Sequence, residues 1–187
     1  MQNEIALDKI RLRTFPDPIL RKRSGEVEVT QQVKEAVKRM AGIMYANNGI
    51  GLAAPQIGVN LRMFLVDTGD GLIEFINPTI VPLKSRMTKM EEGCLSVPGV
   101  GVEVRRIDKI KVSACDSSGR PFVREFSGLK ARAIQHENDH LDGKLIIDYL
   151  NPLSRIVVEG KFRRGGKKQK KTCEVACYDG EGRTRRS

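Results

Sequence analysis

The stretch Gln135-His-Glu-Asn-Asp-His140 decides how this chain folds and which chemistry it can support. On an α-helix, residues i and i+4 are about 400° apart, so His136 and His140 project from nearly the same face and can bind one metal ion. Glu137 lies about 100° further round the helix, where its carboxylate can reach a metal-bound water rather than the metal itself. The chain contains only these two histidines. The pattern therefore predicts a metal site on a helix.

The surrounding sequence predicts an α+β domain. The helix that carries the two histidines is expected over about 128–141, and a second, N-terminal helix over about 30–47, where Thr30 is a suitable N-cap. Apolar residues recur at helical spacing in that second helix and predict a buried stripe: Val33, Val37, Met40 and Met44. Four segments are typical of antiparallel strands, namely 61–67, 72–77, 107–115 and 121–126. The segments 49–56 and 83–93 are expected to be loops.

Two histidines leave a catalytic metal one protein ligand short. The longer zinc-protease motif has a third histidine six residues after the second, but position 146 of this chain is isoleucine. Glu159 is a possible third ligand, although it has no helical motif around it. Cys94 is the better candidate, because a thiolate binds Zn²⁺ or Fe²⁺ well and Gly93 before it permits close backbone approach. A small buried hydrophobic role for Cys94 stays open. The His-Glu-x-x-His pattern alone would also fit a zincin-type endoprotease.

The composition limits the classes of protein that the chain can belong to. Its 187 residues fit one domain with a tail, and no apolar run reaches the length that spans a bilayer. The first 13 residues lack the apolar core of a secretory signal. The number and spacing of the four cysteines do not resemble a disulfide framework: Cys94, Cys115, Cys173 and Cys177. A reducing, cytoplasmic location is expected.

The net charge of +10 is concentrated at the C-terminus. Residues 161–187 contain ten basic and three acidic residues, a net charge of +7, which leaves only +3 for residues 1–160. The tail 161–187 has no apolar period and is expected to be disordered. A basic tail allows an alternative or additional role in binding ribosomal RNA or another polyanion. Aromatic residues make up 5% of the chain and tryptophan is absent, so base-stacking surfaces are not expected.

Three motifs occur together in the order and spacing that resemble the peptide deformylase family: Gly49-Ile-Gly-Leu-Ala-Ala-Pro-Gln56, Glu92-Gly-Cys-Leu-Ser96 and Gln135-His-Glu-Asn-Asp-His140. The resemblance covers about residues 9–155. It implies a cytoplasmic metallohydrolase that removes the formyl group from N-formylmethionine of newly synthesised polypeptides and releases formate. It also implies antiparallel β-sheets packed around a central helix that carries the histidine motif, with 1–160 as the catalytic domain.

The resemblance further implies a role for individual residues. Cys94, His136 and His140 would bind one divalent ion, with Fe²⁺ as the native metal and Zn²⁺, Ni²⁺ or Co²⁺ as replacements. Glu137 would act as general base and then as proton donor to the departing amine. The Gln56 side chain and the Leu95 backbone N–H would stabilise the oxyanion.

The substrate would be a nascent formylated polypeptide, which the basic tail could help to meet through transient contact with the ribosome. Glycines at positions 49, 51 and 93 would let an extended peptide approach the backbone and pair as an added strand. Three apolar or small residues could line a pocket for the methionine side chain: Ile50, Ala133 and Ile134.

Overall fold

The computed structural model describes residues 5–165, which form an α+β fold. The helices are α1 (Gln31–Ala46), α2 (Gly128–Leu141) and α3 (Pro152–Gly165), with four short 3-10 turns, η1 (Leu7–Lys9), η2 (Pro18–Arg21), η3 (Ala54–Ile57) and η4 (Ile146–Tyr149). The strands are β1 (Gly51–Ala53), β2 (Met63–Val66), β3 (Ile73–Pro82), β4 (Met87–Glu92), β5 (Val102–Ile107), β6 (Lys109–Cys115) and β7 (Pro121–Ser127).

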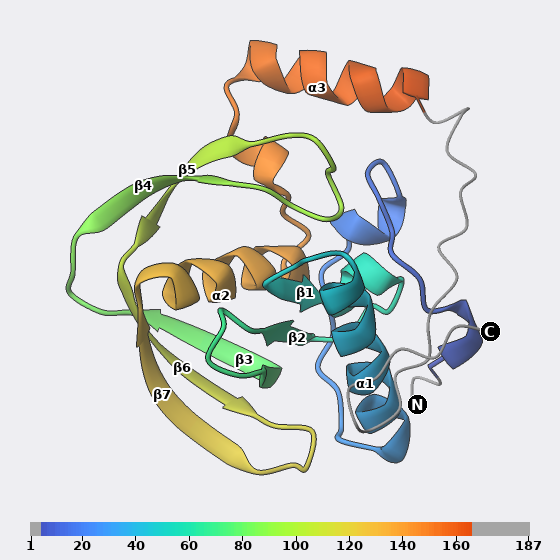
Figure 1. The fold of residues 1–187 in the computed structure, drawn as a ribbon, viewed down its shortest axis with the longest axis vertical. Helices are drawn as coiled ribbons and strands as arrows, with labels where there is room; N and C mark the ends of the chain where they lie inside the picture. The colour runs from blue at the N-terminus through green and yellow to red at the C-terminus, as the bar shows by residue number, and fades with distance from the viewer. Residues whose placement is uncertain (1–4, 166–187) are drawn as a thin grey trace.

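The strands form two antiparallel sheets, and α2 lies between them (Figure 1). One sheet has five strands in the order β1-β2-β3-β6-β7, and the other is the two-stranded sheet β4-β5. The expected central helix is therefore confirmed, with α2 running over the residues that the sequence predicts. The N-terminal helix is confirmed as well, since the Thr30 hydroxyl accepts a hydrogen bond from the Val33 N–H at 3.3 Å and caps α1.

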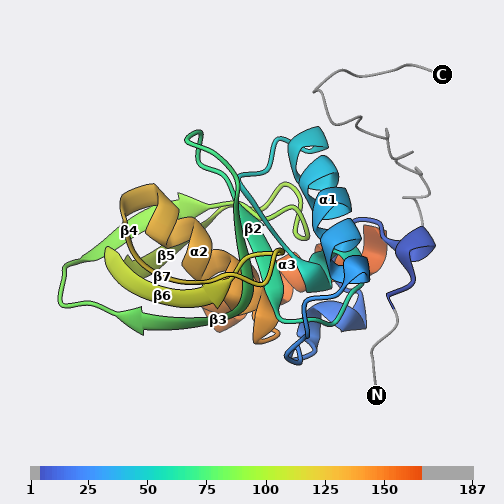
Figure 2. The same cartoon turned by 90° about the horizontal axis from the view of Figure 1, so that it is seen from below.

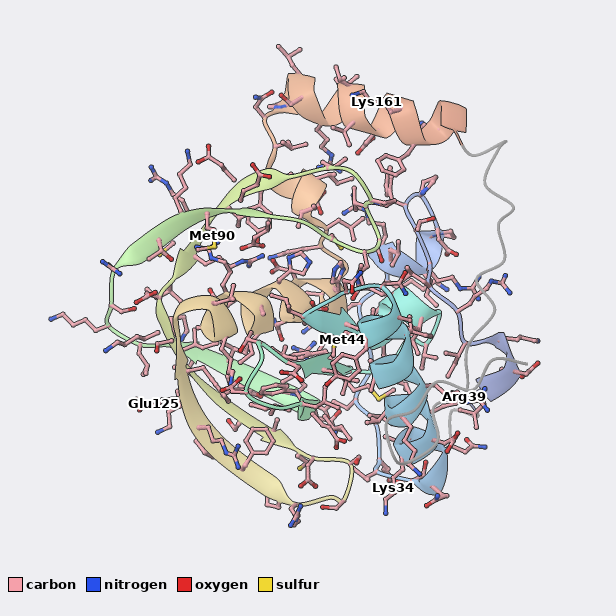
Figure 3. All side chains as sticks on the ribbon, in the orientation of Figure 1. Lys34, Arg39, Met44, Met90, Glu125 and Lys161 are labelled. Carbon is pink, nitrogen blue, oxygen red and sulfur yellow. The ribbon has the colours of Figure 1, made fainter. Side chains whose placement is uncertain are left out.

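The strand β2 is buried on both faces, which explains its uninterrupted apolar sequence. Met63 and Leu65 belong to the core beneath α1, and Phe64 and Val66 to the core beneath α2. Figure 2 shows α1 and α2 on opposite sides of the five-stranded sheet at β2. In α1, Met44 points into the core whereas Lys34 and Arg39 point outward (Figure 3), as the predicted apolar stripe requires.

Two predicted loops are wrong. Within 83–93 the strand β4 pairs along its length with β5. Most of its side chains are exposed, so the sequence shows no apolar alternation there, and the backbone pairing alone makes the strand. Within 49–56 the short strand β1 forms the edge of the large sheet and the turn η3 follows it. The sequence does not indicate this strand, because it is short and fully buried, with Leu52 between a glycine and an alanine.

The helix α3 extends past Lys161, where the sequence predicts that disorder begins. Val158 and Phe162 are four residues apart and pack onto the core beneath β5, and the Phe162 ring meets Phe15 edge-on at 5.7 Å between centroids. This apolar pair explains why the helix continues to Gly165. The rest of the predicted tail, including Cys173 and Cys177, lies outside the described residues. Among residues 5–165, no helix is both long and apolar enough to cross a bilayer.

Candidate metal centre and active site

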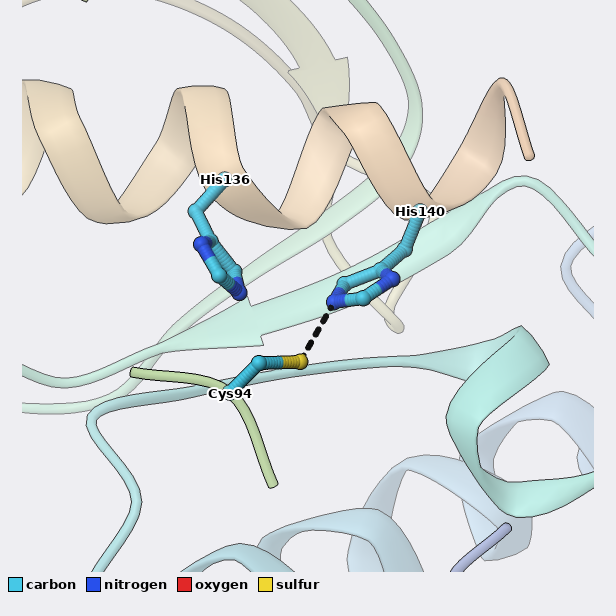
Figure 4. A group of neighbouring side chains, drawn as sticks. All are labelled: Cys94, His136 and His140. Carbon is cyan, nitrogen blue, oxygen red and sulfur yellow. Dashed lines mark hydrogen bonds between the residues drawn. The ribbon is translucent and has the colours of Figure 1, made fainter. Parts of the chain in front are cut away.

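The two histidines and Cys94 converge on one point beside α2. Their ligand atoms all lie within 4.8 Å of one another, and Cys94 Sγ is 3.2 Å from His140 Nε2. Both imidazoles leave α2 on the same side and face Cys94 (Figure 4). A tetrahedral ion with ordinary Zn–S and Zn–N bond lengths separates its ligands by about 3.5 Å. The donor set and its spacing therefore fit a divalent metal ion.

A buried carboxylate orients the first histidine. Glu92 is only 7% exposed, and its Oε2 accepts a hydrogen bond from His136 Nδ1 at 3.0 Å. Since Nδ1 is used in this way, Nε2 is left to bind the metal. Burial alone would raise the pKa of Glu92, but hydrogen bonds from His136 and Arg106 outweigh it and lower the pKa to about 2.

Two further charged residues, Arg106 and Asp139, extend this contact into a network behind the metal centre. Arg106 is 5% exposed and donates to Glu92 from Nε at 2.7 Å and from Nη2 at 2.8 Å. Its Nη1 donates to Asp139 at 2.9 Å, and the Tyr149 hydroxyl donates to the same carboxylate at 2.7 Å. The network joins β4, β5 and α2, so it holds Cys94 and the histidines in register.

This network was not predicted from the sequence. Its one signal is Arg106, which occupies an inward-facing position in β5 after Val102 and Val104. A charged residue at a strand position that faces the core indicates a buried partner of opposite charge. That partner, Glu92, could not be recognised because its strand was expected to be a loop.

Glu137 is buried beside the metal ligands without a compensating hydrogen bond. Its side chain is nearly inaccessible, and within residues 5–165 no group bonds its Oε2. Burial raises the pKa of Glu137 from 4.5 to about 7, although nearby His136 and Arg106 act in the opposite direction. A carboxyl group with this pKa can accept and return a proton near neutral pH.

The glycine at position 51 makes room for this carboxylate. A Cβ atom on Gly51 would overlap Glu137 Oε1 and lie 2.9 Å from Glu137 Cδ. Gly49 is restricted in a similar way, because its Cβ would lie 2.9 Å from Leu95 Cδ1. The two glycines therefore allow close packing within the site, a contribution that the expected role in peptide binding did not include.

The Gln56 side chain is fixed with its donor end toward the site. Its Oε1 accepts from the Ala53 N–H at 2.7 Å, so Nε2 must point the other way. There Nε2 donates to Ser96 Oγ at 3.2 Å and lies 3.6 Å from Cys94 Sγ. The structure thus places the Gln56 amide beside the metal ligand Cys94, and its expected role at the oxyanion stays a prediction.

Of the residues expected to contact the substrate, some are exposed and others are buried. Ile50 is 44% exposed, and Gly93 is exposed with open space around its Cα. Ala133 is buried in the same core as Ile134 but keeps 6% of its surface exposed. Ile134 is completely buried in the core beneath α2, so it does not reach a surface from which a substrate could approach.

Comparison with known proteins decides the family. A family model described as polypeptide deformylase matches residues 10–156 of the chain. The chain belongs to the polypeptide deformylase family. This confirms the resemblance of the three motifs and favours it over the zincin-type endoprotease.

Deformylases of known sequence and structure are similar over most of their length. The peptide deformylase of Thermotoga maritima is 42% identical over 153 residues, which are 81% of this chain and 93% of the relative. Peptide deformylase 1 of Clostridium perfringens is 48% identical over 141 residues, 74% of this chain and 95% of the relative. A crystal structure of the Ehrlichia chaffeensis deformylase in complex with actinonin matches with a TM-score of 0.80 at 35% identity, covering 86% of this chain and 98% of that one.

Proposed function

We propose that the chain hydrolyses the N-terminal formyl group of N-formylmethionine on newly synthesised polypeptides and releases formate. The observation that carries this proposal is the convergence of Cys94, His136 and His140 beside Glu137, in a chain of the polypeptide deformylase family. A formyl amide is a poor electrophile and water is a poor nucleophile, so both must be activated. The residues of the site can supply that activation together with a metal ion.

Cys94, His136 and His140 would hold one divalent ion. When bound, such an ion lowers the pKa of a water molecule and polarises the formyl carbonyl. The set of one thiolate and two imidazoles accepts Fe²⁺, Zn²⁺, Co²⁺ or Ni²⁺. We propose Fe²⁺ as the native ion, on the basis of the family resemblance.

Glu137 would transfer the protons of the reaction. Its buried carboxylate lies beside the histidines with Oε2 unbonded within the described residues, so it can accept the proton of the attacking water. It would then return that proton to the departing amine, which must leave in neutral form. The raised pKa of Glu137 suits both steps near neutral pH.

The oxyanion would be stabilised by two donors. The contact between Gln56 Oε1 and the Ala53 N–H directs the Gln56 amide N–H bonds toward the metal ligands. Among the described residues, no acceptor bonds the Leu95 N–H. A preorganised donor of this kind contributes about 10²- to 10³-fold in rate.

The substrate backbone would pair with the edge of the large sheet. The strand β1 pairs with β2 on one side only, so its other edge can accept an added strand. Gly49 and Gly51 lie at this edge and Ile50, between them, exposes its side chain to an incoming peptide. Gly93 and Ala133 complete the proposed substrate surface.

Formate release from an N-formylmethionyl peptide by the metal-loaded chain tests the function. The expected result is one formate per deformylated peptide, with no cleavage of internal peptide bonds. The same peptide with an acetyl group in place of formyl serves as control. A chain that holds one ion and cleaves internal bonds without releasing formate would support the endoprotease and exclude this proposal.

The rate should fall in acid because Glu137 becomes protonated. The Glu137 pKa of about 7 applies without an ion, and a nearby dication lowers it, so we expect the acid limb of kcat between pH 4.5 and about 7. In this range the metal-free native state binds more protons than the unfolded state, so its free energy of unfolding should decrease as pH rises. A pH–rate profile and denaturant unfolding over the same range measure both effects. If the acid limb of the pH–rate profile persists unchanged in Glu137→Gln, the titrating group is a residue other than Glu137.

Replacing Gly51 with alanine should impair catalysis through Glu137. The added methyl group overlaps the Glu137 carboxylate, which must move away from its position beside the histidines. A misplacement of about 1 Å costs on the order of 10² in rate. Steady-state kinetics and metal analysis check this. Gly42→Ala in α1, where an added Cβ meets nothing within 4 Å, is the control for the general effect of losing a glycine. Full activity of Gly51→Ala would show that the close packing is not needed.

A further inference from the structure

Arg132 is a buried arginine that lies one helical turn before His136, outside every role assigned above. It is 5% exposed. Nη1 donates to Glu92 Oε1 at 2.7 Å and to the Val104 carbonyl at 2.9 Å. Nη2 donates to the Thr88 carbonyl at 2.8 Å and to Thr88 Oγ1 at 2.9 Å. One guanidinium therefore bonds both strands of the small sheet.

The small sheet depends on such contacts for its position. Within the described residues, β4 and β5 pair only with each other, and an isolated two-stranded sheet is marginally stable. The other polar links between this sheet and α2 include the Arg106–Asp139 pair and the bond from Gln135 Nε2 to the Ile107 carbonyl at 2.9 Å, both of which reach β5. The bond from His136 Nδ1 reaches β4 only at its last residue, Glu92. Arg132 bonds Glu92 and also Thr88, four residues earlier in β4.

The position of β4 sets the position of the third metal ligand. Cys94 follows the last residue of β4, Glu92, after a single glycine. The histidines, in contrast, are fixed to α2. The distance between Cys94 and the histidines is therefore determined by how β4 sits on α2, and Arg132 is an α2 side chain that bonds β4 at two residues.

Arg132 also shares Glu92 with His136. Glu92 Oε1 accepts from Arg132 and from Arg106, while Oε2 accepts from Arg106 and His136. The four N–H donors hold the carboxylate in one orientation. Arg132 thus acts on two of the three ligands, on Cys94 through the strand and on His136 through the carboxylate.

We propose that Arg132 is a positioning residue of the metal centre, which aligns β4 with α2 so that the Cys94 thiolate meets the two histidines. It acts through Glu92, Thr88 and Val104 rather than on the reacting atoms. Losing an outer-shell partner of a metal ligand typically weakens metal binding by about 10- to 100-fold. The proposal rests on the metal site itself and not on the identity of the substrate.

The test measures Co²⁺ binding to the full chain and its variants. The dissociation constant comes from competition with a chromophoric chelator, and the thiolate-to-Co²⁺ charge-transfer absorption reports the Cys94 bond. For Arg132→Met we expect binding weakened by about 10- to 100-fold, with a weaker or shifted absorption. Arg132→Lys should recover binding only in part, because one ammonium cannot bond Glu92, Val104 and Thr88 together.

The controls separate positioning from stability. Arg105→Met changes the neighbouring exposed arginine of β5 and should leave Co²⁺ affinity and absorption unchanged. Thr88→Val removes one acceptor with little change of shape, so if Arg132→Met does not fold, this variant should still weaken Co²⁺ binding several-fold. Folded Arg132 and Thr88 variants that bind Co²⁺ with unchanged affinity and absorption, whatever their melting temperatures, would overturn the proposal. Weakened Co²⁺ binding together with formate release by the fully loaded variant would support the proposal and leave the proposed function intact.

Discussion

The Glu137→Gln variant should release formate about 10²- to 10⁴-fold more slowly than the unchanged chain while it binds its metal ion normally. Glutamine has nearly the same shape as glutamate, so the packing against Gly51 is kept, but its amide cannot accept the water's proton. Steady-state kinetics with an N-formylmethionyl peptide and elemental analysis of the same sample measure the two effects.

The same substitution should increase stability at alkaline pH. The ionised Glu137 carboxylate is buried with Oε2 unbonded among the described residues, and this environment raises its pKa to about 7. A neutral amide avoids the cost of burying that charge. The melting temperature of metal-free Glu137→Gln at pH 8 should exceed that of the unchanged chain, and Glu125→Gln, on an exposed position of β7, should change neither rate nor stability. Full activity of the Glu137→Gln variant would remove Glu137 from the mechanism.

The Cys94→Ala variant should lose its metal ion and its activity together. Cys94 is one of three ligands, and its removal leaves two imidazoles from a single helix. The affinity for the ion should fall by more than the ~10- to 100-fold that is typical of losing an outer-shell partner. Metal content after gel filtration and formate release provide the measurements.

Cys115→Ala is the matched control for the loss of a cysteine. Cys115 packs against the core beneath α1, away from the metal ligands, so its replacement should leave the metal content at one ion per chain. Retention of the ion by Cys94→Ala with unchanged affinity would contradict the assignment of the third ligand. It would be the result expected of an endoprotease whose site uses other residues.

Much of the fold could be predicted because its long elements bury clear apolar patterns. The bounds of α2 follow from the motif and its glycines, and α1 from the Thr30 cap and the apolar stripe. The strand β4 could not be predicted, because its side chains are mostly exposed and only its backbone pairing with β5 makes it a strand. The last turn of α3 depends on tertiary contacts of Val158 and Phe162, which a local pattern does not reveal.

The candidate site shows the same division. Ligands with a fixed helical spacing, His136 and His140, could be recognised directly, and Cys94 by the chemistry of the missing ligand. The contacts of Arg132 and Arg106 with Glu92 could not be recognised. They link α2 and β5 to β4, a strand that the sequence pattern does not predict. Ile134 illustrates the opposite error, because an apolar residue next to the motif faces the core rather than a pocket.

A titration of the metal-free chain with Fe²⁺ under anaerobic conditions tests most directly whether the chain is a metal-dependent deformylase. The rate of formate release from an N-formylmethionyl peptide is followed as the ion is added. We expect the rate to rise in proportion to the ion and to reach a plateau at one equivalent per chain. A chain that binds one equivalent and releases no formate, or one that releases formate at full rate without an ion, would contradict this mechanism.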